Sequence, residues 1–291
     1  REHARQRVQQ DPPHAQLAGH RARVLPGRAA EAAQRVLARV VAGLHGQTVF
    51  HDTHGRSPGI PLSIQIGEPT VVARALGCPV VSNFRMADVL EGGEGAPLVP
   101  RFDWHQFASP THDRALVNLG GIANLTRLRP KAKLSDLIAF DCGPGNMLID
   151  GIMAALAPEG PRYDAGGARA ASGKAADAVV REFLADPFMQ RRFPKSAGRE
   201  DFGAAYLERF LKRTEGLGTE DRLRTAVEIT AGAVAQGIAL SGGTPHEVYV
   251  SGGGALNRTL LAAIRAALPG AKVVTTETLG EPPHPRDEMA S

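Results

Sequence analysis

The chain has 291 residues, of which 43% are hydrophobic and 22% are charged, an ordinary composition for a globular protein. No apolar run approaches the ~20 residues that a membrane-spanning helix needs, which argues against a membrane protein. The two cysteines, Cys78 and Cys142, are too few for a disulfide framework or a four-thiolate zinc site. Residues 1–10 lack the apolar core of a secretory signal, so we expect a reducing, cytoplasmic setting.

The net charge of +4 is unevenly spread along the chain. Residues 1–40 hold eight arginines against three acidic residues, so the rest of the chain is nearly neutral. Aromatic residues make up only 5%, and a basic face interleaved with aromatic side chains is not expected. The distribution therefore argues against nucleic acid as a partner.

The first 115 residues contain an irregular start followed by short predicted elements. Residues 1–28 combine Arg, His, Gln and Pro without periodicity, which predicts a poorly ordered segment. Apolar residues then recur at helical spacing over residues 29–44, which predicts a helix. Beyond it we expect a strand at residues 62–66, a short helix at residues 70–75 that Gly77 ends, a strand at residues 79–81 and a glycine-proline loop at residues 92–97.

A second group of predicted elements begins near residue 115. Its strands and helices alternate along the chain, which favours an α/β fold. The strands are expected at residues 116–119, 122–128, 137–140, 247–250 and 272–276. The helices are expected at residues 147–156, 175–184, 202–211, 222–240 and 257–268.

Two glycine-rich turns follow predicted strands in this second group. They read Asn118-Leu119-Gly120-Gly121-Ile122-Ala123-Asn124 and Ser251-Gly252-Gly253-Gly254-Ala255-Leu256-Asn257. Glycines let backbone N–H groups approach a phosphate closely, and a helix N-terminus after the second turn adds positive potential. For each turn taken alone, a tight hairpin or a plain strand–helix connection is the simpler interpretation, because glycines are common in turns after strands. As a pair in one α/β block they favour nucleotide binding, although neither has Rossmann spacing or a Walker A Lys-Ser/Thr pair.

Asp141 is predicted at the carboxyl end of a strand, just before the Gly143–Asn146 turn. Ligands of open α/β sheets bind at such strand ends, and a carboxylate there is a candidate general base. An N-cap of the following helix is an equally good interpretation, because Asp fills that position well. The position alone leaves both interpretations open.

Polar residues beside the first predicted strands are candidates for a sugar site. The His45–Thr48 run offers hydrogen bonds to hydroxyl groups, and Arg85 offers a bidentate partner for a carboxylate. A turn and a surface arginine are the simpler interpretations of the same residues. Lys195 to Glu200 offers cations for an anion, or forms a solvated loop. The ten histidines show no paired metal spacing, so no metal ligand is assigned.

Eight sequence strings occur in one order along the chain. The first four are His-Gly-Gln-Thr-Val from His45, Gln-Ile-Gly-Glu-Pro from Gln65, Val-Val-Ser-Asn-Phe-Arg from Val80 and Gly-Gly-Glu-Gly-Ala-Pro-Leu-Val-Pro from Gly92. The last four are Asn-Leu-Gly-Gly-Ile-Ala-Asn-Leu from Asn118, Phe-Asp-Cys-Gly-Pro-Gly-Asn-Met from Phe140, Lys-Ser-Ala-Gly-Arg-Glu from Lys195 and Gly-Gly-Gly-Ala-Leu-Asn from Gly252. The ordered set resembles the anhydro-N-acetylmuramic acid kinase family, over about residues 40–280. A set of this size is far more specific than either glycine turn alone.

The resemblance implies an α/β protein of the two-domain actin/hexokinase/Hsp70-type, in which ribonuclease H-like domains flank a central cleft. It divides the chain into an irregular segment at residues 1–28, the remainder of a first, sugar-side domain at residues 29–115, and a second, nucleotide-side domain at residues 116–291. The family opens with a Gly-Thr-Ser-x-Asp-Gly-x-Asp phosphate loop, a string that this sequence lacks. The first domain is therefore expected to be incomplete.

The resemblance also implies an enzyme, a phosphotransferase that uses ATP and Mg²⁺. The implied reaction opens the anhydro ring of 1,6-anhydro-N-acetylmuramic acid with water and phosphorylates the freed 6-oxygen. The product, N-acetylmuramic acid 6-phosphate, belongs to peptidoglycan recycling. The implied partners are this amino sugar and ATP, without nucleic acid or membrane, and a homodimer is compatible with the resemblance.

The motifs of the family imply roles for individual residues of this chain. Asp141 matches the catalytic aspartate, whose task is to deprotonate the attacking water. The first glycine turn corresponds to a phosphate hairpin, and the second lies near the adenosine. The residues implied to bind ATP are Asn118, Gly120, Gly121, Asn124, Gly252, Gly253, Gly254 and Asn257. The residues implied to bind the sugar are His45, Gln47, Thr48, Arg85 and Glu288, the last of which lies near the place of a late family glutamate.

Several positions depart from the residues usual in the family. Asn83 replaces Asp, Glu94 replaces Gln, and both Cys142 and Ala197 replace Thr. Together with the missing phosphate loop, these departures leave a second hypothesis open, a truncated, inactive paralogue that only binds sugar or nucleotide. A third hypothesis is an Hsp70-like or acetate-kinase-like ATPase with another substrate, and the sugar-side strings weigh against it.

Overall fold

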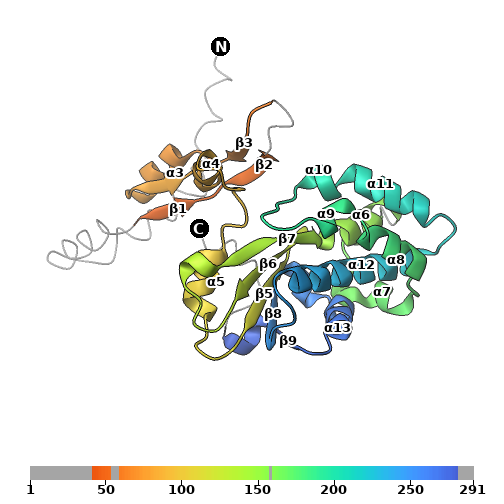
Figure 1. The fold of residues 1–291 in the computed structure, drawn as a ribbon. Helices are drawn as coiled ribbons and strands as arrows, with labels where there is room; N and C mark the ends of the chain where they lie inside the picture. Colours follow the sequence, from red (N-terminus) through yellow and green to blue (C-terminus); the bar gives the residue numbers. More distant parts are fainter. Residues whose placement is uncertain (1–40, 54–58, 157–158, 281–291) are drawn as a thin grey trace, which may run out of the picture. The chain divides into compact units, whose positions relative to one another are not determined.

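The computed structural model describes residues 41–53, 59–156 and 159–280 (Figure 1). These residues divide into two compact units. The first unit contains residues 41–50 and 64–84, and the second contains the other described residues. The irregular segment predicted at residues 1–28 and most of the helix predicted at residues 29–44 lie outside the described residues. The domain boundary expected at residue 115 stays a prediction.

The first unit is built on short strands. β1 (Ala42–Leu44) pairs in parallel with β4 (Val80–Ser82), with Ala42 opposite Val80. The end of the predicted helix at residues 29–44 is therefore wrong, because Ala42–Leu44 takes the extended conformation that this pairing requires. β2 (Gln47–Asp52) and β3 (Leu62–Ile66) form a separate two-stranded sheet, and the predicted strands at residues 62–66 and 79–81 are confirmed in outline.

α3 (Pro69–Leu76) shows why a short helix forms in this unit. The Glu68 side chain accepts a hydrogen bond from the Thr70 backbone N–H at 2.9 Å, and proline occupies the start of the helix. Gly77 ends it in the left-handed conformation, at φ 65°. The helix predicted at residues 70–75, and its stop at Gly77, are thus confirmed. α4 (Phe84–Leu90) and α5 (Pro100–Phe107) follow in the chain and were not predicted from the sequence.

A five-stranded mixed sheet, in the order β7-β6-β5-β8-β9, forms the centre of the second unit (Figure 1). Its strands are β5 (Arg114–Leu119), β6 (Ile122–Leu128), β7 (Ile138–Pro144), β8 (Glu247–Ser251) and β9 (Lys272–Thr275). The β5–β6 and β6–β7 pairs are antiparallel, whereas β8 pairs in parallel with β5 and with β9. This order and these directions are those of a ribonuclease H-like domain, which confirms the predicted α/β fold class for this unit.

Helices cover both faces of this sheet, as the alternation along β5 requires. Ala115, Val117 and Leu119 point into one core with α6 (Asn146–Leu156), α12 (Thr219–Leu240) and α13 (Arg258–Ala267). Leu116 points the other way and packs with Phe107 at the end of α5. The predicted helices at residues 147–156, 222–240 and 257–268 are confirmed within a few residues.

Shorter helices of the second unit lie between α6 and α12 along the chain. They are α7 (Ala168–Ser172), α8 (Asp177–Leu184), α9 (Pro187–Gln190), α10 (Arg199–Phe202) and α11 (Ala204–Arg213). Phe183 joins α8 to α11, with its ring edge-to-face against Tyr206 at 5.3 Å and Phe210 at 5.5 Å between ring centroids. Within the described residues, no helix is long and apolar enough to cross a membrane.

β7 is the element in which the sequence prediction fails in a way that matters for function. The strand was expected to end at Phe140, but it continues to Pro144. Antiparallel pairing with β6 sets this length, because Asn124 lies opposite Asp141 and Ile122 lies opposite Pro144, with a β-bulge at Ala123/Asn124. Asp141 is therefore inside the strand rather than after it.

Candidate active site

The two predicted glycine turns lie side by side at one edge of the sheet. Because β5 and β8 are parallel neighbours with Asn118 opposite Ser251, the turns that follow them emerge together. Gly252 has φ +81°, and a Cβ there would lie 2.5 Å from the Asn118 side-chain oxygen and 2.8 Å from the Leu119 carbonyl oxygen. A glycine at position 252 is thus what allows the second turn to pack directly onto the first.

The start of α6 is fastened to the first glycine turn. The Asn146 backbone N–H donates to the Gly120 carbonyl oxygen at 2.8 Å, and the Gly145 N–H donates to the Gly121 carbonyl oxygen at 2.9 Å. The Asn146 side-chain amide also donates to the Leu119 carbonyl oxygen at 3.0 Å. The hairpin and the helix N-terminus form one rigid corner, and Asn146 is a structural residue of that corner that the sequence analysis missed.

Asn257, predicted to bind nucleotide, has a structural task of its own. Its side-chain oxygen accepts from the Leu260 backbone N–H at 2.9 Å and so caps the N-terminus of α13. Beside it, the Thr259 hydroxyl donates to the Gly167 carbonyl oxygen at 2.7 Å. The cap sets the direction in which α13 leaves the second glycine turn. The nucleotide contact of Asn257 stays a prediction.

Asp141 is buried, with 5% of its surface exposed, and lies on β7 opposite Asn124. Its backbone N–H donates to the Lys195 carbonyl oxygen at 3.1 Å, and its Oδ2 accepts from the Ala197 backbone N–H at 2.8 Å. The alternative interpretation as a helix N-cap is wrong, because α6 begins only at Asn146 and the Asp141 carboxylate faces a different segment. What remains is a buried carboxylate held between a strand and the Lys195–Ala197 segment.

Lys195 is a buried cation rather than part of a solvated loop, which corrects the sequence interpretation. Its ammonium donates to the carbonyl oxygens of Phe188 at 3.0 Å and Met189 at 3.3 Å, and it lies 4.7 Å from the centre of the Phe188 ring. Burial lowers the pKa of Lys195 from its ordinary value. With 1% of its surface exposed, Lys195 anchors the segment that contacts Asp141.

Cys142, the neighbour of Asp141 on β7, lies in an environment that lowers the reactivity of its thiol. It is 1% exposed, and burial raises the pKa of its thiol to about 12. Because the thiolate is the nucleophilic form of cysteine, burial disfavours Cys142 as a nucleophile at neutral pH.

Arg85 is bound to the glycine-rich loop rather than isolated on the surface. Its guanidinium donates to the Gly95 carbonyl oxygen at 2.8 Å, and the Gly95 N–H donates to the Asp88 carboxylate at 2.7 Å. In the same loop, Glu94 Oε2 accepts from the hydroxyls of Thr53 at 2.7 Å and Ser196 at 2.8 Å. The structure thereby brings this loop to the segment that holds Asp141.

His51 is a polar residue near this loop that the sequence analysis missed. Its Nδ1 lies 2.9 Å from the Ser63 hydroxyl oxygen. Burial, and then the nearby Arg85 charge, lower the pKa of His51, which favours the neutral ring. In the sequence, Val49 and Phe50 separate His51 from the polar run that ends at Thr48, so no local pattern singled it out.

Three other predicted sugar-binding residues belong to the first unit: His45 lies in the β1–β2 turn, and Gln47 and Thr48 begin β2. His45 Nδ1 lies 2.7 Å from the Gly46 carbonyl oxygen, and the Gln47 side-chain amide donates to the Thr48 carbonyl oxygen at 3.3 Å. They are therefore in a different compact unit from Asp141. Glu288 lies outside the described residues.

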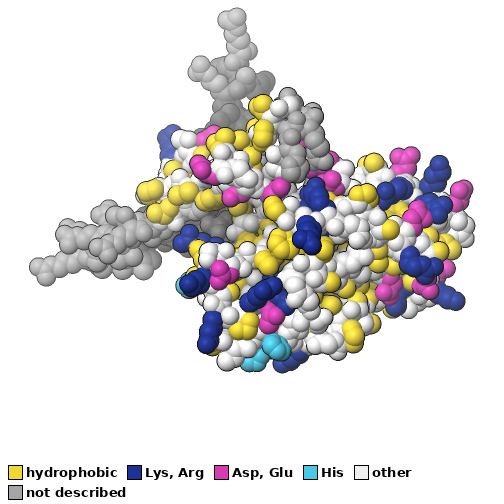
Figure 2. Space-filling view, viewed as in Figure 1, with side chains coloured by type: hydrophobic (Ala, Val, Ile, Leu, Met, Phe, Trp, Pro, Cys, Tyr) yellow, Lys and Arg dark blue, Asp and Glu magenta, His cyan; other side chains and the backbone are white. Residues whose placement is uncertain are grey.

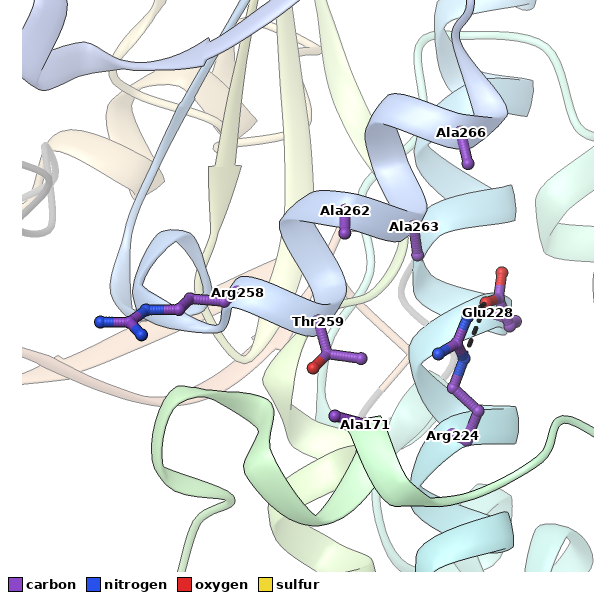
Figure 3. Close-up of a pocket in the computed structure, with 8 residues that line it drawn as sticks. All are labelled: Ala171, Arg224, Glu228, Arg258, Thr259, Ala262, Ala263 and Ala266. Carbon is purple, nitrogen blue, oxygen red and sulfur yellow. Dashed lines mark hydrogen bonds and ion pairs between the residues drawn. The ribbon is translucent and has the colours of Figure 1, made fainter.

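A separate pocket of about 490 Å³ lies among α7, α12 and α13 (Figure 3). Alanines of α7 and α13 form much of its wall, and the Arg224–Glu228 ion pair of α12 lies on one side, at 2.7 Å. None of the predicted site residues lines this pocket. Within residues 41–53, 59–156 and 159–280, no group of three or more His, Cys, Asp or Glu side chains could hold a metal ion.

Comparison with known proteins places this geometry in a family. A family model described as anhydro-N-acetylmuramic acid kinase matches residues 20–291. An anhydro-N-acetylmuramic acid kinase of Pseudomonas fluorescens (strain Pf0-1) is 39% identical over 248 residues, covering 85% of this chain and 66% of that protein. One of Pseudomonas paraeruginosa (strain DSM 24068 / PA7) is 38% identical over 248 residues, covering 85% of this chain and 65% of that protein. The chain thus spans just under two thirds of the length of these curated relatives.

Among solved structures, the activator of the 2-hydroxyisocaproyl-CoA dehydratase from Clostridium difficile with bound ADPNP is similar at a TM-score of 0.42 and 15% identity. The alignment covers 80% of this chain and 86% of that chain. A likeness this distant carries no argument about a ligand of the present chain.

Proposed function

The chain belongs to the anhydro-N-acetylmuramic acid kinase family, and on this basis we propose that it is an ATP-dependent sugar kinase. The proposed substrate is 1,6-anhydro-N-acetylmuramic acid. Water adds to the anomeric carbon, the bond from that carbon to the bridging oxygen breaks, and the freed 6-oxygen takes the γ-phosphoryl group of ATP. The products are N-acetylmuramic acid 6-phosphate and ADP, which places the reaction in the cytoplasmic recycling of cell-wall sugar.

The observation that carries this proposal is the placement of Asp141. A carboxylate acting as general base accepts the proton of the attacking water, as in inverting glycoside cleavage. Asp141 is buried, and its Oδ2 is oriented by the Ala197 N–H. It lies on β7, which pairs with β6 of the glycine hairpin, and this pairing supports a general base near the proposed phosphate-binding turn.

The space around the glycine turns supports the proposal that they bind the phosphates of ATP. A Cβ at Gly120 would meet nothing nearer than 3.5 Å, and one at Gly253 nothing nearer than 3.7 Å, so the backbone at both positions is open to close approach. The N-terminus of α13 adds positive potential next to the second turn. We assign phosphate binding to Asn118, Gly120, Gly121 and Asn124, and the adenosine side to Gly252, Gly253, Gly254 and Asn257.

We propose that Mg²⁺ binds together with the nucleotide rather than as an ion that the protein holds by itself. Nucleotide sites commonly bind Mg²⁺ through one or two carboxylates together with substrate phosphates. When bound, Mg²⁺ would neutralise charge that develops on the phosphoryl group. For the sugar we assign His45, Gln47, Thr48, Arg85 and Glu288, with Arg85 as the partner of the lactyl carboxylate.

The test is product formation by the purified chain with the anhydro sugar, ATP and Mg²⁺, followed by mass spectrometry. The expected product has gained one water and one phosphoryl group. Asp141→Asn keeps the shape of the side chain but cannot take the proton, and a lost general base typically costs about 10²–10⁴-fold in turnover. The Asn variant should still bind ATP.

Two results would contradict the kinase proposal. Binding of sugar or ATP without any product would favour the alternative, a chain that only binds these ligands. Turnover by Asp141→Asn close to that of the unchanged chain would remove Asp141 from the mechanism.

A further inference from the structure

We infer that Glu94 is a positioning residue for Asp141, acting through the Lys195–Ala197 segment. The inference rests on the proposed role of Asp141 as general base. It concerns a residue to which the resemblance gives no role in the chemistry, and it is carried by hydrogen bonds within the second unit.

The Lys195–Ala197 segment is the part of the molecule that holds Asp141 in place. The carbonyl oxygen of Lys195 accepts the Asp141 N–H, and the Ala197 N–H donates to Asp141 Oδ2 at 2.8 Å. Ser196 lies between these two contacts. A displacement of Ser196 therefore affects both the Lys195 carbonyl that accepts the Asp141 backbone N–H and the Ala197 N–H that donates to the Asp141 carboxylate.

Glu94 holds Ser196 from the outer side of this segment. Its Oε2 accepts the Ser196 hydroxyl at 2.8 Å and, on the same oxygen, the Thr53 hydroxyl at 2.7 Å. Hydrogen bonds to an ionised carboxylate are about twice as strong as bonds between neutral groups. Thr53 in turn fixes the direction of the Glu94 carboxylate, so Ser196 is tied to a residue that is itself oriented.

The inner side of the segment is held independently by Lys195. Its ammonium is bonded to the Phe188 and Met189 carbonyl oxygens, and 1% of its surface is exposed. The segment is thus restrained on two sides, by a buried cation and by the Glu94 carboxylate. Removal of Glu94 releases only the outer restraint, which allows the effect on Asp141 to be measured in a folded protein.

The experiment follows the backbone amide signal of Ala197 by NMR in protein labelled with ¹⁵N-alanine. Asp141→Asn changes the acceptor of this N–H and must move the signal, which verifies the probe and identifies its resonance. We expect Glu94→Ala and Ser196→Ala to shift or broaden the same signal, because each removes one end of the same hydrogen bond. Glu94→Gln keeps an oxygen acceptor and should restore the signal of the unchanged chain. Alanine signals remote from residues 195–197 serve as the control for overall folding.

The kinetic counterpart uses turnover of the anhydro sugar. Glu94→Ala should lower kcat by about 10–100-fold with little change in the KM for ATP, since small misplacements of a reacting group cost up to about 10² in rate. Glu94→Gln should recover most of the rate. Ala197 signals that stay unchanged in both Glu94→Ala and Ser196→Ala would overturn the inference. Shifted signals in a chain that forms no product would leave the positioning contact standing and refute the proposed activity.

Discussion

The two compact units differ sharply in how much of their surface they bury. Among the described residues of the first unit, only Cys78 is buried. Several large apolar side chains of that unit are exposed, namely Val41, Val49, Ile64, Ile66, Val71, Leu76 and Val81. Figure 2 shows hydrophobic side chains at the surface over the part of the molecule where Figure 1 places α3. The strands and helices of the second unit instead enclose one large core around β5, α6, α12 and α13.

This difference shows that helices of the two units are stabilised in different ways, by local interactions in the first unit and by packing in the second. α3 has no buried residue, and its ends are explained by Glu68 and Gly77, which are local features. The helices of the second unit gain most of their stability from apolar faces packed against the sheet. Mutations should therefore have large effects in the second unit and small effects, mostly at helix ends, in the first.

The largest expected effect is at Phe183. Phe183→Ala removes a ring that is 1% exposed and packs against Tyr206 and Phe210, so it should reduce the free energy of unfolding by about 3–5 kcal/mol. Val71→Ala in α3 is the matched control, since Val71 is 65% exposed and its change should stay within about 0.5 kcal/mol. Urea unfolding followed by circular dichroism measures both variants. Equal losses of the free energy of unfolding would contradict the expected difference between the two units.

An intermediate effect is expected from glycines with positive φ. Gly77→Ala at the end of α3, with φ +65° and no atom within 4 Å of the added Cβ, should cost about 1–2 kcal/mol from the backbone conformation alone. Gly252→Ala has a larger backbone cost, because φ 81° with ψ 174° is a region that essentially only glycine adopts, and it also brings the Cβ to 2.5 Å from the Asn118 side-chain oxygen. It should destabilise the protein more and weaken binding of a non-hydrolysable ATP analogue. Similar values for the two variants in thermal melts would show that the glycine turns are not tightly packed.

The smallest expected effects concern the pH dependence of stability. Removing a carboxylate should raise the free energy of unfolding in the second unit and lower it in the first. Burial raises the pKa of Asp150, on α6, to about 6, so ionisation costs stability as the pH rises from about 4 to 6. Asp150→Asn should therefore raise the free energy of unfolding at pH 7, by no more than about 1 kcal/mol for this partly exposed group, and should have no effect near pH 4.

Glu68, at the start of α3, supplies the opposite case. Hydrogen bonds from Thr70 lower the pKa of Glu68, so its stabilising effect is present above its ordinary pKa and is lost as the pH falls. Glu68→Gln should reduce stability at pH 7 and approach the unchanged chain in acid. Unfolding curves for both variants between pH 3.5 and pH 7 test the signs, and parallel pH profiles would contradict them.

Local patterns in the sequence predicted much of this structure. The hairpin at Asn118–Asn124 and the long helix α12 were correct because glycine turns and apolar periodicity act over short distances. α4 and α5 were missed, since their short stretches carry weak periodicity. The ordered motifs also led to the family that the comparisons then established.

The sequence by itself determined the family, the main strands and helices of the second unit in their order, and the positions of its two glycine turns. Only the tertiary structure decided the surroundings of Asp141. β7 continues past Phe140 because its partner β6 is long enough to pair with it, and Lys195 is buried because α9 and the Phe140 ring enclose it. Both outcomes depend on contacts between segments that are distant in sequence, such as Glu94 with Ser196, and no local pattern encodes them.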